Sequence, residues 1–118
     1  MSKCTTLLIM CCLAFLFVTS ACSNSADQIA ANQDKAERII LALDDYEHDY
    51  GQFPENLEAL VPGYLTEIPE TTSGQSFVYR LDSDEGYFLI FSVPGEQNLA
   101  CRYIHRWELW DCSYGDSH

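Results

Sequence analysis

The chain is 118 residues long and carries 18 Asp and Glu against six Lys and Arg, a net charge of −12 at pH 7. This length supports one small domain rather than two. The acidity disfavours nucleic acid and anionic lipid headgroups as partners, because a negatively charged protein repels both, and it permits cationic proteins, peptides or divalent metal ions.

Residues 1–21 are predicted to be a lipoprotein signal peptide. Lys3 precedes an apolar run at residues 7–18, and small residues follow, which is the pattern of a secretory signal. The segment Thr19-Ser20-Ala21-Cys22 resembles a bacterial lipobox. Cys22 is therefore predicted to carry lipid and to begin the mature chain.

Two neighbours of Cys22 refine this prediction. Thr19 stands where a lipobox usually has leucine, which leaves open an ordinary secretory signal cut nearby or an uncleaved anchor. Ser23 follows the cysteine in place of an aspartate that would resemble an inner-membrane retention signal. We expect a protein anchored in the outer membrane of a Gram-negative cell, facing the periplasm or the cell surface.

The six cysteines divide into three groups under this prediction. Cys4, Cys11 and Cys12 leave with the signal, and Cys22 takes lipid. Cys101 and Cys112 remain as a pair in an oxidising compartment, so a disulfide between them is predicted. Their spacing, without a second cysteine pair, argues against a structural zinc site.

Residues 22–31 are predicted to be a tether, followed by one domain at residues 32–118. Ser25 and Gln28 also match a capping box, so a helix could begin inside the tether. Apolar residues then recur at helical spacing up to Tyr50, with acidic residues on the opposite face. Gly51 and Pro54 are expected to end this helix.

The second half of the chain has the pattern of a small sheet. One or two short helical turns are expected around residues 55–61, and a loop at residues 71–75. Residues 76–82 and 86–93 are rich in β-branched and aromatic side chains and predict a hairpin. Residues 99–107 are expected to supply a third strand, to which the tail from Leu109 would be joined by the disulfide. The prediction is an α+β fold in which one amphipathic helix packs on about three antiparallel strands.

Residues 35–91 resemble the soluble domain of type II secretion major pseudopilins and related type IV pilin-like proteins. The resemblance is carried by a helix ending in a tyrosine, an acidic residue, a glycine and an aromatic-proline step, then a leucine-rich short helix, a proline turn and a three-stranded antiparallel sheet. The matching positions are Tyr46, Asp49, Gly51, Phe53, Pro54, Leu57, Leu60, Pro69, Gly74 and Tyr79. The resemblance implies a pilin-like fold and a role in protein–protein contact.

The chain also departs from that family. It has a lipobox-like signal in place of the long hydrophobic helix that assembles pseudopilin filaments. Thr71-Thr72-Ser73-Gly74 stands where the family has Asp-Pro-Trp-Gly, and its calcium-binding loop has no convincing counterpart. Filament assembly and the calcium site are therefore not expected here.

The candidate chemical sites favour structural interpretations. Asp44 with His48, and Asp45 with Asp49, lie four residues apart on a helix, but calcium needs more oxygen ligands, usually from a loop, so solvated charge is the better interpretation. His105 between two cysteines suggests a nucleophile only if a thiolate is free. No metal site, cofactor or catalytic residue is predicted.

Four aromatic residues near the C-terminus, Tyr103, Trp107, Trp110 and Tyr114, are candidates for partner binding, with core packing as the alternative. The predicted function is a non-catalytic, lipid-anchored envelope protein that acts as a binding or assembly module. The alternative is a periplasmic inhibitor or sequestering protein for a cationic partner such as a lysozyme.

Overall fold

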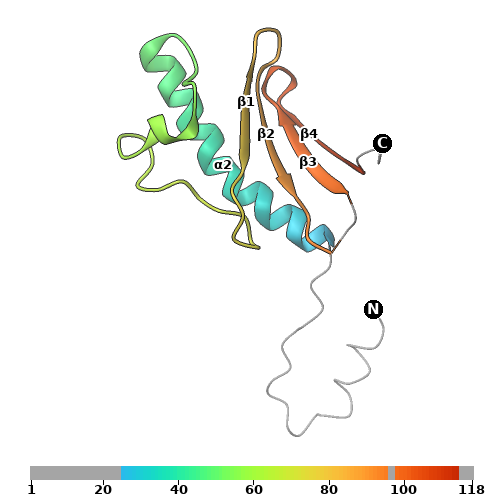
Figure 1. Ribbon diagram of the computed structural model, residues 1–118. Coiled ribbons are helices and arrows are strands. Elements are labelled where there is room, and N and C mark those ends of the chain that lie inside the picture. The colour runs from blue at the N-terminus through green and yellow to red at the C-terminus, as the bar shows by residue number, and fades with distance from the viewer. Residues whose placement is uncertain (1–24, 96–97, 115–118) are drawn as a thin grey trace, which may run out of the picture.

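The computed structural model describes residues 25–95 and 98–114. Helix α2 (Ser25–Tyr50) packs on a four-stranded antiparallel sheet in the order β1-β2-β3-β4 (Figure 1). The strands are β1 (Val78–Asp82), β2 (Gly86–Ser92), β3 (Leu99–Ile104) and β4 (Leu109–Tyr114). The predicted α+β class is thus confirmed, with four strands where about three were expected. Cys22, the predicted signal at residues 1–21 and His118 lie outside the described residues.

Helix α2 begins at Ser25, as the capping box allowed, so residues 25–31, which were predicted as part of the tether, are helical. The first turns are held by contacts further along the chain. Asn32 is fully buried, and its Oδ1 accepts a hydrogen bond of 2.7 Å from the backbone N–H of Thr72. Ile29 is partly buried against the core. The helix ends as predicted, because Gly51 takes a φ of +78° and donates its N–H to the Glu47 carbonyl at 2.7 Å.

The segment between α2 and the sheet contains one short 3-10 helix, η1 (Leu57–Leu60), within the region where helical turns were expected. Asn56 caps it, since its side chain accepts a hydrogen bond of 3.2 Å from the Ala59 N–H. Leu57 and Leu60 point into the core and are buried. This segment therefore closes one end of the space between α2 and the sheet.

The fourth strand is the main difference from the predicted sheet. Strand β3 ends at Ile104, and a short 3-10 turn, η2 (His105–Trp107), reverses the chain. Glu108 then adopts the left-handed conformation with a φ of +50°, which brings Leu109 directly opposite Ile104. Because the pairing continues to Tyr114 opposite Leu99, the tail forms a full edge strand rather than a loose end joined only by the disulfide.

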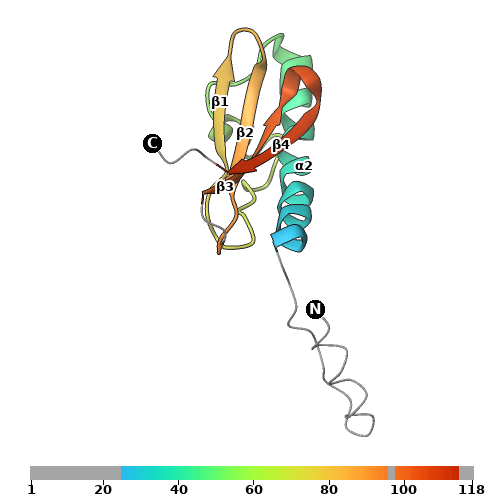
Figure 2. The same ribbon diagram turned by 90° about the vertical axis from the view of Figure 1, so that its right-hand side faces the viewer.

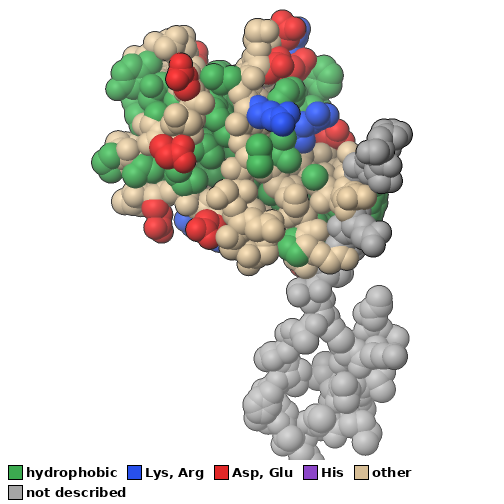
Figure 3. Space-filling view, viewed as in Figure 1, with side chains coloured by type: hydrophobic (Ala, Val, Ile, Leu, Met, Phe, Trp, Pro, Cys, Tyr) green, Lys and Arg blue, Asp and Glu red, His purple; other side chains and the backbone are tan. Residues whose placement is uncertain are grey.

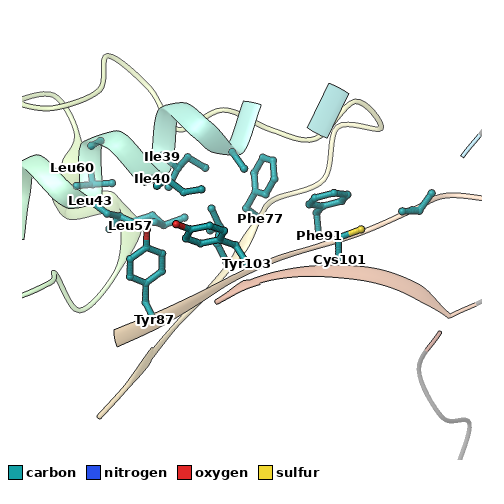
Figure 4. Packing of buried hydrophobic residues seen from close by; sticks show 14 of the residues in the cluster. Ile39, Ile40, Leu43, Leu57, Leu60, Phe77, Tyr87, Phe91, Cys101 and Tyr103 are labelled. Carbon is teal, nitrogen blue, oxygen red and sulfur yellow. The ribbon is translucent and has the colours of Figure 1, made fainter. Parts of the chain in front are cut away.

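The core lies between α2 and one face of the sheet (Figure 4). Strand β2 alternates strictly, with Tyr87, Leu89 and Phe91 buried toward the helix and the residues between them only partly buried. Figures 1 and 2 show no described helix on the other face of the sheet. The buried cluster contains Ala36, Ile39, Ile40, Ala42, Leu43, Leu57, Leu60, Phe77, Tyr87, Leu89, Phe91, Val93, Leu99, Cys101 and Tyr103.

Candidate functional site

The four aromatic residues predicted to bind a partner do not form one surface. Tyr103 is 9% exposed and belongs to the core. Trp110 is half-buried, with its ring 5.4 Å from those of both Phe91 and Tyr103. Trp107 and Tyr114 are 58% and 64% exposed, but Tyr114 stands at the end of β4 opposite Leu99, away from η2. The packing alternative therefore describes Tyr103 and Trp110, and the structure leaves Trp107 and Tyr114 as separate exposed rings.

The predicted disulfide between Cys101 and Cys112 is confirmed, with an S–S distance of 2.05 Å. The two residues face each other directly across β3 and β4. Both sulfurs are bonded, so neither cysteine is a thiolate that His105 could activate in this structure.

His105 instead joins η2 to the core and to α2. Its ring stacks on Tyr87 at 4.9 Å and meets the ring of Phe53 edge-on at 4.8 Å. Its Nε2 lies 3.9 Å from Asp44 Oδ1. Partial burial raises the pKa of Asp44, and the nearby His105 opposes that shift. Because the ion pair is long and Asp44 is 53% exposed, the aromatic contacts hold His105 more than the charges do.

Gly86 is required where His105 packs on β2. Its φ is +86°, and a Cβ added there would lie 2.5 Å from His105 Nδ1. We expect Gly86→Ala to lower the free energy of unfolding by about 2 kcal/mol, because it combines backbone strain with displacement of the ring. Chemical unfolding would measure the loss. Gly63→Ala is the control, since a Cβ there meets no atom within 4 Å; equal stability of the two variants would contradict the prediction.

The acidic side chains at the end of α2 lie at the surface. Asp44, Asp45, His48 and Asp49 are all exposed. Asp49 accepts a hydrogen bond of 2.6 Å from the Tyr64 hydroxyl. Among residues 25–95 and 98–114, no three His, Cys, Asp or Glu side chains gather as a metal site would require.

The sheet has a second face, which sequence analysis did not identify as a site. This outer sheet face carries apolar side chains, most of them partly buried or exposed, together with arginines. Phe88 lies near its centre, opposite Arg80 on β1 and Ile104 on β3. The Arg102 guanidinium lies 5.2 Å from the centre of the Phe88 ring and forms a 3.3 Å ion pair with Asp111. The outer sheet face comprises Val78, Arg80, Phe88, Ile90, Arg102, Ile104, Leu109 and Asp111.

A small hollow of about 160 Å³ opens beside Phe88 on this face. It is lined by Glu85, Phe88, Arg102, Ile104 and Trp107. Ile104 is 6% exposed although it lies outside the main core cluster. The hollow thus places the exposed Trp107 ring, from η2, next to the outer sheet face. Figure 3 shows Lys and Arg side chains gathered over the strands beside hydrophobic surface.

The outer sheet face was difficult to predict because strand β2 is apolar at successive positions. The run Tyr87-Phe88-Leu89-Ile90-Phe91 gives no polar alternation from which to choose a buried side. A signal exists in β1, where Val78 and Arg80 alternate with Phe77 and Tyr79. Extending that alternation across the hairpin would have placed Phe88 beside Arg80.

Comparison with protein-family models, curated proteins and solved structures gives no match to this chain. The resemblance to pseudopilin domains therefore remains a prediction based on the matching residues. Among the described residues there is also no helix with the length and apolarity needed to cross a membrane.

Proposed function

We propose that the protein is a non-catalytic, lipid-anchored bacterial envelope protein whose pilin-like domain binds another envelope protein. Lipid on Cys22 would hold it at the outer membrane, with the domain reaching into the periplasm or over the cell surface. Support for the anchor comes from the lipobox-like segment. Support for binding comes from the domain itself.

The observation that carries the binding role is Trp107 beside the outer sheet face, which no described helix covers (Figures 1 and 2). Its side chain is 58% exposed and lines the hollow next to Phe88 and Ile104. Trp and Arg are enriched among the residues that contribute most to protein interfaces, and both are present here. The hollow is well below the 300–1,000 Å³ typical of small-molecule sites, so it suits one side chain of a partner better than a small ligand.

Cross-linking and pull-down of the full-length protein from envelopes would test the binding role. We expect Trp107→Ala to weaken recovery of the partner by about thirtyfold, the effect of losing an interface residue worth about 2 kcal/mol. Tyr114→Ala is the matched control, because it removes another exposed ring at the far end of β4. Equal recovery with folded Trp107→Ala protein would reject this surface.

The lipid anchor needs a separate measurement. Mass spectrometry of the mature N-terminus should give the mass of an acylated Cys22. An unmodified Cys22, or a chain that still begins at Met1, would overturn the anchor while leaving the binding role untouched.

The alternative function, capture of a cationic partner such as a lysozyme, is favoured by the exposed side of α2. Asp34, Glu37, Asp44 and Asp45 are exposed on it. Binding through this side would be mainly electrostatic, so the partner should be released at high salt. Retention of the partner at high salt, together with its loss in Trp107→Ala, would favour the outer sheet face.

A further inference from the structure

The basic residues of this acidic protein are unevenly distributed. Three of the six Lys and Arg residues, Arg80, Arg102 and Arg106, lie on the outer sheet face or at its end. Arg80 and Arg102 stand on the strands either side of β2 and flank Phe88. Arg106 extends from η2 to the hairpin, where its Nη1 donates to the Asp84 carbonyl at 3.2 Å. The exposed side of α2, by contrast, is rich in carboxylates.

Two carboxylates near these arginines, those of Asp82 and Asp111, already make contacts within the domain. Asp82 accepts hydrogen bonds of 2.9 Å from the backbone N–H groups of Asp84 and Glu85, which shape the β1–β2 turn. Asp111 pairs with Arg102, but both side chains are nearly half exposed, so this pair contributes little and is readily exchanged. Within the described residues, Arg80 has no ion pair. The guanidinium groups of Arg80 and Arg102 are thus available to an incoming carboxylate.

The hollow beside the arginines suits an apolar side chain of the partner and not a carboxylate. Phe88, Ile104 and Trp107 give it an apolar lining, and Glu85 is the one carboxylate in that lining. Glu85 Oε2 is buried and accepts no hydrogen bond within the described part of the chain. An anion in the hollow would be repelled by Glu85, so an apolar side chain fits there and a carboxylate fits over Phe88, between Arg80 and Arg102.

We propose that the outer sheet face binds an acidic segment of another protein, in which carboxylates alternate with apolar side chains. This inference rests on the proposed binding function and specifies the chemistry of its partner. The carboxylates meet Arg80 and Arg102, and an apolar side chain enters the hollow beside Trp107. The arginines make this face locally positive, although the chain as a whole is negative. The face is therefore expected to prefer an acidic partner segment to a cationic one.

Short capped peptides that contain Leu with Glu, with Gln or with Lys are suitable probes for the full-length protein in detergent micelles. The chain has two tryptophans, so Trp110→Phe leaves Trp107 as the only one and keeps a ring against Phe91 and Tyr103. Fluorescence of Trp107 then reports binding at the hollow. Calorimetry on the unmodified chain provides a second measurement that does not depend on this variant.

The Glu peptide should bind in a saturable manner and more weakly as salt rises. Arg80→Gln combined with Arg102→Gln should weaken that binding about tenfold, as expected for the loss of two exposed ion pairs. Lys35→Gln combined with Arg38→Gln changes the net charge equally on α2 and should leave the affinity unchanged.

Stronger binding of the Lys or Gln peptide at Trp107 would overturn the acidic preference and leave the proposed binding surface intact. Failure of all three peptides to bind would overturn the acidic-segment inference, while the envelope cross-linking test with Trp107→Ala decides the proposed function independently. Self-association of the chain that is lost in the double arginine variant would show that the face is covered by a second copy, and would also overturn the inference.

Discussion

Replacing both disulfide cysteines, Cys101→Ala with Cys112→Ala, is expected to lower the free energy of unfolding by about 3 kcal/mol. The bridge closes a loop with a sequence separation of 11, and about 3 kcal/mol is the chain-entropy value for a loop of that length. The effect is large for a domain of this size, whose total stability should be on the order of 5–15 kcal/mol. Urea unfolding of the full-length protein, followed by circular dichroism, would measure it.

The loss should be greatest at β4. Among the strands, β4 pairs only with β3, and its other edge is free within the described chain. Hydrogen exchange should therefore speed up at residues 109–114 before it does in β2. A reducing agent should reproduce the loss in the natural chain and have no effect on the double variant. An unchanged unfolding midpoint in the variant would contradict the prediction.

The disulfide also bears on the outer sheet face. Leu109 and Asp111 of β4 belong to that face, and Asp111 pairs with Arg102. Loss of order in β4 would remove these two residues and free Arg102 to move. The bridge thus stabilises the edge of the surface that we propose to bind a partner.

The helix was predictable because its signals are local. Apolar residues at helical spacing define the buried side of α2, and Gly51 with its positive φ ends the helix at the predicted position. The start at Ser25 agrees with the capping box of Ser25 and Gln28, and the first turns are also held by a contact 40 residues away, between Asn32 and Thr72. No local pattern indicates that a polar Asn32 will be buried.

The sheet was harder to predict because its strand pairing depends on contacts that no local pattern indicates. Strand β4 is mostly exposed, and its pairing depends on the reversal at Glu108, a residue that rarely takes a positive φ. The candidate site was predicted only in part. The aromatic residues at positions 103–114 include Trp107, which lines the hollow. The four rings do not form one surface because Tyr103 and Trp110 pack together against the core and Tyr114 stands at the far end of β4. Trp107 lies in η2, outside the strands.

Alkaline pH is expected to destabilise the fold, chiefly through Tyr87. This side chain is fully buried, and its hydroxyl makes no hydrogen bond within the described residues. Burial raises the pKa of Tyr87 well above the ordinary value of 10.0. Burial also raises the pKa of Tyr79, whose hydroxyl donates to the Pro54 carbonyl at 2.7 Å, and the pKa of Tyr103.

The sign of the effect follows from the protonation of the Tyr87 phenol in the folded and unfolded protein. The folded protein keeps the Tyr87 phenol neutral, whereas the unfolded chain ionises near pH 10. Stability from this group is complete below pH 10 and is lost as the pH rises above it, by about 1.4 kcal/mol per pH unit until the folded pKa is reached. At pH 12 the loss from Tyr87 alone should be about 3 kcal/mol. Urea unfolding between pH 8 and pH 12, with recovery checked on return to neutral pH, would measure the slope.

Tyr87→Phe isolates the contribution of the hydroxyl to stability from that of the ring. The variant keeps the ring against Phe53 and His105 and removes a buried polar group that has no partner, so its stability at pH 7 should equal or exceed that of the natural chain by up to about 1 kcal/mol. Above pH 10 it should lose stability less steeply, because one buried phenol no longer ionises on unfolding. Tyr114→Phe is the control, because it removes an exposed hydroxyl instead of a buried one. If Tyr87→Phe instead lowers stability at pH 7 and keeps the full alkaline slope, the Tyr87 hydroxyl is satisfied in solution and burial is not the cause of the loss.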